Sequence, residues 1–359
     1  SYVPLVVSTP PRPRVQVDRL YGALIGFVLG DALGAPHNSS TLQYTGLLSH
    51  RFSISAIDRE KDGLMGVGQV TSNTEMMLTL FRSILSNGGW NYASVVESYA
   101  TWGSSQCPSR SYLTRQLFDS HGSSVISVRT YEGRYEKMFG KPYHGSSFPS
   151  RDQSNGSLAR SLPLALIDDP YVEQDITLTH PNYINIELSQ CYVRLLKMAL
   201  RGELPQQLWN ELLNSRSCVI KYIVSAVSGG DNWNLVSTEL GEAEAETKGW
   251  CVFSFYVVVC LIHGLSQDPS LSLTRCMEWI IRDHPGSDTN TNAAVMGAMA
   301  GAIMGASKIL SDPIMRENYE KITSPMTTDF PRPRQYQPHD LSSLAEAGAA
   351  LASRYPPRT

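Results

Sequence analysis

The chain has 359 residues and a net charge of −3 at neutral pH, and 42% of its residues are hydrophobic. That hydrophobic share is sufficient for a sizeable core, and the length fits one large domain or two ordinary ones. Only 18% of the residues are charged, below the roughly 25% that is typical of soluble domains. The near-balanced charge argues against general nucleic-acid binding.

Targeting and membrane signals are not expected from this sequence. Residues 1–16 are rich in proline and lack the basic start of a signal peptide. The longest uncharged run, 250–265, is short for a membrane span and predicts a buried helix. The six cysteines are widely spaced and contain no C-x-x-C pair, which favours reduced thiols. We therefore expect an intracellular protein without a membrane partner.

Helical periodicity of apolar residues recurs along the chain, whereas convincing alternating strands are absent. In the first predicted helix, 18–30, glycines recur every four residues, which indicates close packing against a neighbour. Residues 103–157 are rich in Ser, Gly, Tyr and Arg and are expected to form long loops with short helices. The other predicted helices span 76–85, 92–102, 186–200, 208–213, 219–228, 250–264, 273–282, 292–309 and 341–352.

These helices predict one compact all-α domain at 17–323, because no Pro-, Gly- or Ser-rich linker divides them. A Pro-rich N-terminal arm occupies 1–16, and a C-terminal segment at 324–359 combines a Pro-rich stretch with the final helix. Pro-rich ends normally fray. We therefore expect that both ends either lie on the domain or are held by a partner.

Two polar motifs lie next to the first helices. Asp31 follows the first predicted helix in G-D-A-L-G, where its simplest role is a C-cap turn with bonds to local amides. The motif T-S-N-T at 71–74 precedes a helix, and its side chains are typical of an N-cap. Taken singly, neither motif requires a function.

Three further features could carry chemistry. Arg160 lies in an apolar helix that follows the turn Q-S-N-G, so it needs a carboxylate or phosphate partner or, more simply, a solvated face. His180 and His284 could be ligands, although lone histidines are more often core or surface residues. The stretch 284–305 places Asp, Thr and Asn before a helix of small residues. Their oxygens are ligands that hard cations prefer, and the helix dipole faces them.

In this order and at these separations, the motifs resemble those of the ADP-ribosylglycohydrolase family. Members share G-D-A-L-G-x-P, T-D-D-T, N-G-x-x-M-R-x-x-P-L, T-H-P and G-D-T-D-T-N-A-A. The corresponding segments here are GDALGAP at 30–36, TSNT at 71–74, NGSLARSLPL at 155–164, THP at 179–181 and GSDTNTNAA at 286–294. The resemblance implies an all-α fold with a cleft that holds two magnesium ions beside ADP-ribose, where the bond at the ribose C1″ is hydrolysed.

The resemblance also implies which residues form the site. The magnesium ligands correspond to Thr71, Ser72, Asn73, Asp288, Asn290 and Thr291. A glutamate that some members use falls at Asn38, which with Asp31 marks a degenerate catalytic site, and the ADP-ribose pocket would include Asn155, Gly156, Arg160 and His180. Of the carboxylates expected among the metal ligands and at position 38, Asp288 alone is present. Neutral amide and hydroxyl oxygens are weaker ligands for magnesium, so we expect no metal cofactor.

We expect a non-catalytic family member that acts as a structural or interaction component of an assembly and binds other protein subunits through its Pro-rich ends. Two alternatives stay open. One is a hydrolase of ADP-ribose conjugates that retains a weak magnesium site at Asp288, Thr291 and Thr71. The other is a metal-independent binder of ADP-ribose or a related nucleotide, in which amides at the helix starts near 74 and 292 face the pyrophosphate.

Overall fold

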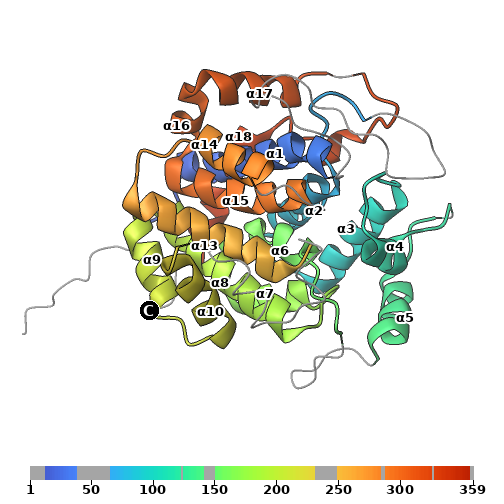
Figure 1. The fold of residues 1–359 in the computed structure, drawn as a ribbon. Helices are drawn as coiled ribbons and strands as arrows, with labels where there is room; N and C mark the ends of the chain where they lie inside the picture. The colour runs from blue at the N-terminus through green and yellow to red at the C-terminus, as the bar shows by residue number, and fades with distance from the viewer. Residues whose placement is uncertain are drawn as a thin grey trace, which may run out of the picture.

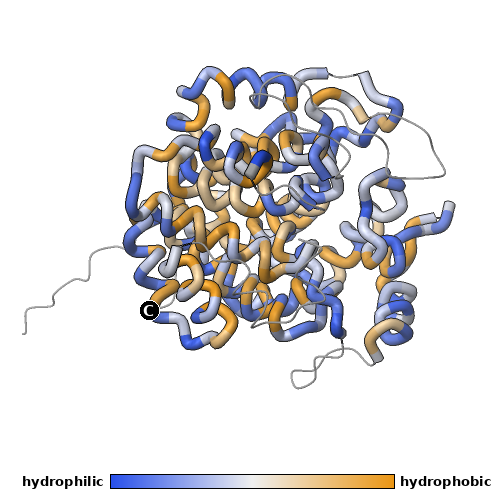
Figure 2. Tube along the Cα trace, viewed as in Figure 1, coloured by the Kyte–Doolittle hydropathy of each residue, from blue (hydrophilic) through white to orange (hydrophobic). Residues whose placement is uncertain are grey.

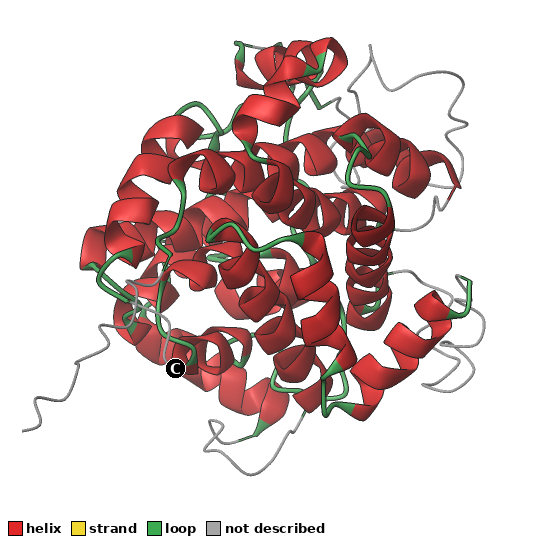
Figure 3. Ribbon diagram, turned by 90° about the vertical axis from the view of Figure 1, so that its left-hand side faces the viewer, coloured by secondary structure: helices red, strands yellow, loops and turns green. Residues whose placement is uncertain are grey.

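The computed structural model describes residues 13–38, 65–122, 124–140, 150–230, 249–283, 288–325 and 327–355. Within these ranges the regular structure is helical, with one isolated bridge between Ser154 and Trp250 and no strand (Figure 3). The predicted all-α fold is confirmed. In the same ranges, no helix combines the length and the apolar character needed to cross a membrane.

The first half of the described chain contains α1 (Val17–Gly34), η1 (Ala35–His37), α2 (Ser72–Asn87), α3 (Tyr92–Ser104), α4 (Tyr112–Phe118), α5 (Val128–Phe139), α6 (Gly156–Ala159), η2 (Leu162–Leu166) and α7 (Pro170–Ile176). The second half contains α8 (Tyr183–Leu200), α9 (Pro205–Leu213), α10 (Cys218–Ser228), α13 (Cys251–Gln267), α14 (Leu273–Glu278), the π-helical turn η3 (Trp279–Asp283), α15 (Thr289–Met304), α16 (Ala306–Ser311), α17 (Pro313–Thr323), η4 (Arg334–Tyr336) and α18 (Leu341–Ala352).

The central helices α1 and α15 come from distant parts of the chain and lie side by side (Figure 1). Their contact is backbone to backbone. A Cβ built on Gly26 would overlap the carbonyl group of Gly297, and one on Gly301 would overlap that of Gly22. Glycine at these positions lets the two helices approach more closely than side chains allow. The close packing predicted from the glycine spacing is confirmed.

Apolar side chains fill the interior around this pair. Figure 2 shows hydrophobic residues concentrated along α13 and α15 in the middle of the molecule, with hydrophilic residues on outer helices. Most of α13 is buried, which confirms the buried helix predicted for the uncharged run at 250–265. All six cysteines are free thiols.

Some helix ends differ from the prediction for local reasons. α1 continues beyond residue 30, so Asp31 lies inside its last turn rather than in a loop. The helix predicted at 292–309 is interrupted at Gly305, whose φ of 82° is strained for other residues. The predicted helices do not include α17, which begins where the Asp312 side chain caps the first backbone amides.

The described part of the C-terminal segment, 327–355, lies on the helical domain. Arg332 forms an ion pair with Glu75 of α2 at 2.8 Å, and α18 packs against α1. Of the predicted N-terminal arm, residues 1–12 lie outside the described residues.

Candidate functional site

A cavity of about 320 Å³ lies where the N-terminal ends of α2 and α15 meet α6. Among the described residues, its lining includes all the sequence-predicted site residues except Asp31 and Thr71, which accept hydrogen bonds from Asn290 of the lining. The lining residues are Asn38, Ser72, Asn73, Met76, Trp102, Ser109, Ser111, Thr114, Ser154, Asn155, Gly156, Ala159, Arg160, His180, Gly249, Asp288, Asn290 and Thr291.

The Asp31 carboxylate is fully buried and ties α1 to the start of α2. Its Oδ2 accepts hydrogen bonds from the Thr71 backbone N–H (2.8 Å) and the Thr74 hydroxyl (2.7 Å). Its Oδ1 accepts from the Thr71 hydroxyl at 2.6 Å and from the Asn290 amide at 3.0 Å. The predicted C-cap role with local amides is therefore wrong, because its donors come from α2 and α15.

The side-chain amide of Asn290 faces Asp31 with its NH₂ group. The Thr71 hydroxyl gives its proton to Asp31 and so presents a lone pair to Asn290 Nδ2, 3.0 Å away. Both neighbours are therefore acceptors, and only the NH₂ end of the amide can satisfy them. Asn290 Oδ1 is left as a buried acceptor without a partner among the described residues.

Asn73 is oriented in the same way. Thr291 gives its hydroxyl proton to Asp288 Oδ1 (2.7 Å) and accepts from Asn73 Nδ2 at 2.9 Å. The hydroxyl of Ser72 turns away and donates to the Ser109 carbonyl at 2.9 Å. Amide groups thus occupy two of the six ligand positions, Asn73 and Asn290, and each donates an N–H to a neighbouring oxygen.

Two predicted positions have clear structural roles. Thr71 caps α2, since its hydroxyl accepts the Asn73 backbone N–H at 3.3 Å, and this N-cap is confirmed. The side chain of Asn38, where some family members have glutamate, accepts the backbone N–H of Asn290 at 3.0 Å. Asn38 thus holds the start of α15 beside η1.

Asp288 lies at the start of α15 with a φ of 142°, an uncommon conformation for a non-glycine residue. Burial raises the pKa of its carboxyl group, and the negative charge of Asp31 adds to this, whereas hydrogen bonds with Thr291 and Asn155 lower it. His284, named from the sequence as a candidate ligand, lies outside the described residues.

This donor set does not fit two magnesium ions. Asp31 accepts several N–H and O–H donors. The Asn73 and Asn290 amides present N–H groups to Thr291 and Asp31 at positions where a metal would need oxygen ligands. Magnesium requires oxygen ligands in near-octahedral geometry. In the described part of the chain, no three His, Cys, Asp or Glu side chains gather as metal ligands.

Arg160 is buried, with 2% of its side chain exposed, so the solvated face considered from the sequence is wrong. Its Nε donates to Asp175 Oδ1 at 2.8 Å, and its Nη2 donates to the Asp175 carbonyl at 2.7 Å. Its Nη1 donates to the Thr179 hydroxyl at 2.7 Å. The alternative, a carboxylate partner, is therefore correct.

His180 lies between this ion pair and the cavity. Its Nδ1 is 2.7 Å from the Thr179 hydroxyl, and its Nε2 is 2.8 Å from the Ser154 hydroxyl. Burial lowers the pKa of the imidazole to about 4, so the ring is neutral at neutral pH. Sequence reasoning missed both Ser154 and Asp175; Ser154 belongs to the Q-S-N-G turn, but the sequence of α7 contains no signal for Asp175.

Backbone bonds fix the position of Ser154. The bridge to Trp250 is flanked by bonds from the Asn155 N–H to the Gly249 carbonyl (3.0 Å) and from the Cys251 N–H to the Gln153 carbonyl (2.9 Å). The turn before α6 is thereby held against the start of α13. Ser154 is thus placed by main-chain pairing rather than by its own side chain.

Two backbone amides near the helix starts have protein partners. The N–H of Thr74 lies 3.3 Å from Asp31 Oδ2, and the N–H of Asn292 donates to the Asp288 carbonyl at 3.1 Å. These two amides have protein partners, and the expectation that the helix starts near them face a pyrophosphate stays a prediction.

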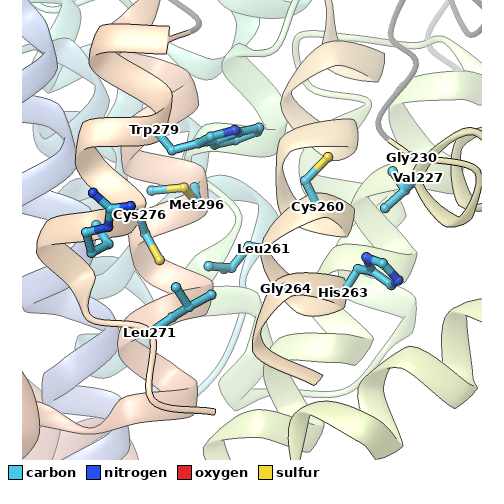
Figure 4. Close-up of a pocket in the computed structure, with 11 residues that line it drawn as sticks. Val227, Gly230, Cys260, Leu261, His263, Gly264, Leu271, Cys276, Trp279 and Met296 are labelled. Atoms are coloured by element: carbon cyan, nitrogen blue, oxygen red, sulfur yellow. The ribbon is translucent and has the colours of Figure 1, made fainter. Parts of the chain in front are cut away.

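A second cavity, of about 360 Å³, lies between α13 and the α14–α15 region. Figure 4 shows Leu261 of α13 facing Cys276 and Leu271 across it, with Trp279 and Met296 nearby. Its lining is mainly apolar and includes none of the sequence-predicted site residues. The cavity at α2, α6 and α15 is therefore the candidate site.

The helical fold and the five motifs gathered around one cavity define the class of protein. The chain belongs to the ADP-ribosylglycohydrolase family, whose model matches residues 11–335. The resemblance noted in the sequence is confirmed.

Individual relatives agree with this assignment. A Rhodospirillum rubrum protein named ADP-ribosyl-dinitrogen reductase glycohydrolase is 29% identical over 174 residues, which are 45% of this chain and 51% of that protein. The chain thus matches about half the length of this relative. An Acanthamoeba polyphaga mimivirus protein named as an ADP-ribosyl glycohydrolase is 23% identical over 312 residues, 79% of this chain and 86% of that protein. A solved structure described as an ADP-ribosylglycohydrolase-related protein complex shares the fold, with a TM-score of 0.60, 19% identity and coverage of 94% and 98% of the two chains.

Proposed function

We propose that this chain is a non-catalytic member of the family that keeps its cavity as a metal-independent binding site for ADP-ribose or a related nucleotide. The observation that carries the proposal is Asn290 Oδ1, a buried acceptor that has no partner among the described residues and belongs to a side chain lining the cavity. A buried acceptor without a partner is costly. A ligand hydroxyl, such as those of ribose, would satisfy it.

The amide donors at the metal-ligand positions argue against catalysis. The family reaction needs cations to polarise the substrate and orient a water. Here Asn73 donates to the Thr291 hydroxyl and Asn290 donates to the Asp31 side chain, so N–H groups satisfy these oxygens without a cation. Asn38 has no carboxylate and cannot act as a general base.

An assay of ADP-ribose release from ADP-ribosylated protein tests this half of the proposal. We expect no release above the uncatalysed rate, with or without magnesium. Magnesium-dependent release by the purified chain would overturn it. A variant that combines Ser72→Asp, Asn73→Asp, Asn290→Asp and Asn38→Glu should gain magnesium affinity, because it restores anions at the ligand positions.

A hydrolase with a reduced magnesium site is the second candidate. It is favoured by the names of the two relatives, which describe hydrolases. Thr71, Asp288 and Thr291 would hold the metal. The hydrogen bond between Thr291 and Asp288 would have to break first, so metal binding would be weak.

The role in an assembly, binding other protein subunits through the Pro-rich ends, remains a prediction, as does the intracellular location. Arg332 of the C-terminal P-R-P-R motif is bound to Glu75, so a partner of this segment would contact its exposed side chains, such as Arg334. Size-exclusion chromatography of the protein as extracted tests this role: co-elution with a stoichiometric partner supports it, and a monomer contradicts it.

A further inference from the structure

We propose that Ser154 is the hydrogen-bond donor that the cavity offers to an oxygen acceptor of the ligand, and that the buried Arg160–Asp175 pair sets this polarity through Thr179 and His180. The inference rests on the proposed binding function. It assigns the ligand contact to Ser154, because both ring nitrogens of His180 are occupied.

A chain of hydrogen bonds, here called the relay, runs from Arg160 through Thr179 and His180 to Ser154. It begins at a group that can only donate. The Arg160 guanidinium holds Asp175 with two N–H groups and donates a third to the Thr179 hydroxyl at 2.7 Å. Asp175 is fixed in turn, since Tyr99 and Trp90 donate to its other oxygen at 2.8 and 3.2 Å. The start of the relay therefore cannot reverse its direction.

The Thr179 hydroxyl determines which nitrogen of His180 carries the ring proton. The Thr179 hydroxyl is fully buried, accepts from Arg160 and lies 2.7 Å from His180 Nδ1. If Nδ1 carried the ring proton, the Thr179 proton would have no acceptor among the described residues, which is unfavourable for a buried hydroxyl. Thr179 therefore donates to Nδ1, and the neutral ring carries its proton on Nε2.

The tautomer decides what Ser154 presents to the cavity. His180 Nε2–H donates to Ser154 Oγ across 2.8 Å. The Ser154 hydroxyl then keeps its own proton, which is available to the cavity that the residue lines. With the other tautomer the serine proton would point at the ring, and the cavity would meet only lone pairs.

A donor at this position recognises an oxygen acceptor, and ADP-ribose offers such acceptors on its phosphates and its ribose. The Thr74 and Asn292 amides have protein partners, and Ser154 is the donor that we assign to this acceptor. It complements Asn290 Oδ1, an acceptor on another residue that lines the same cavity.

Two measurements test the inference. Long-range ¹H–¹⁵N spectra of the ligand-free protein, assigned with His180→Gln, should show His180 protonated at Nε2 and bare at Nδ1. Thr179→Val should shift that pattern toward the other tautomer. A wild-type ring protonated at Nδ1 would overturn the relay.

Calorimetry with ADP-ribose tests the contact itself. Ser154→Ala should weaken binding by about 5- to 10-fold, and Thr179→Val by a smaller factor, whereas Ser225→Ala on the exposed face of α10 should change nothing. An equal loss with ADP places the acceptor in the ADP half, and a loss confined to ADP-ribose places it on the terminal ribose. Unchanged affinity of Ser154→Ala would overturn the contact. If the wild-type chain binds no ADP-ribose, the proposed function fails, whereas the spectra still decide the relay.

Discussion

Donors from α2 and α15 converge on the two side-chain oxygens of Asp31 inside the protein. The Asn290 amide supplies one of those donors from a position where the family pattern has a carboxylate. Two carboxylates this close would repel each other without a cation between them. At this scale a neutral amide stands where the family pattern has a carboxylate, and it donates a hydrogen bond to Asp31.

The first prediction concerns that amide. Asn290→Asp should destabilise the metal-free protein by roughly 3 kcal/mol, because it buries a second carboxylate against Asp31. Magnesium should restore part of the loss in the variant, since a cation between the carboxylates relieves the repulsion. Thermal unfolding with and without magnesium measures both effects.

The matched control is Asn210→Asp, on the exposed surface of α9, which should change stability by less than about 0.5 kcal/mol and show no magnesium effect. If Asn290→Asp is as stable as the wild type without magnesium, the amide does not have the role assigned to it.

The second prediction concerns pH. Burial holds the pKa of His180 at about 4 in the folded chain, against about 6.5 in the unfolded chain. Between these values the unfolded chain binds more protons, so stability is complete above pH 6.5 and falls as the pH decreases toward 4. The loss attributable to His180 is up to roughly 3 kcal/mol.

Urea unfolding at pH 7 and pH 4.5 measures this loss. His180→Gln should reduce the difference in stability between pH 7 and pH 4.5. His339→Gln, at an exposed position, should leave that difference unchanged. An unchanged pH difference in His180→Gln would contradict the assigned pKa.

Among the elements, the contact between α1 and α15 places the site. Glycines on both helices let the backbones touch, so the start of α15 comes to the end of α1, beside Asp31. The four-residue spacing of glycine was sufficient to predict the close contact. It could not identify the partner, because that helix lies more than 250 residues away in the chain.

The third prediction follows from that contact. Gly297→Ala should destabilise the protein by about 1–3 kcal/mol or more, because its methyl group would meet the Gly26 backbone and the helices would have to separate. Gly133→Ala is the control, since nothing lies within 4 Å of a Cβ there and the site is within α5. The control should gain up to about 1 kcal/mol from helix propensity. Chemical unfolding compares the two, and equal stabilities would contradict the packing.

Other elements show where sequence reasoning reaches its limit. Apolar periodicity predicted most helices, and the T-S-N-T cap was correct at Thr71. The role of Asp31 was not predictable, because its donors come from segments that only the fold brings together. The same holds for Arg160, whose carboxylate partner was one of the alternatives but whose partner Asp175 could not be named.

A buried ion pair holds the C-terminal segment against the helical domain. Arg332 pairs with Glu75 at 2.8 Å, and the two side chains are only 7% and 1% exposed. Trp102, which lines the cavity, donates to the same carboxylate at 3.3 Å. Through Glu75 and Trp102, the segment is therefore connected to the lining of the candidate site.

The fourth prediction concerns the ion pair between Arg332 and Glu75. Arg332→Met should destabilise the protein by about 3–5 kcal/mol, because it leaves the Glu75 carboxylate buried without its partner. Adding Glu75→Gln should recover a large part of the loss, since no charge then remains. Arg334→Met, at an exposed neighbour, is the control. Calorimetric unfolding of these variants measures the effect. If Arg332→Met is as stable as Arg334→Met, the ion pair does not have the assigned role.

The central claim is that the cavity binds ADP-ribose without magnesium. Isothermal titration of the full chain with ADP-ribose, once with magnesium and once with a chelator, tests it most directly. We expect the same affinity in both titrations. Binding that requires magnesium, or no binding heat at millimolar ligand, would contradict it.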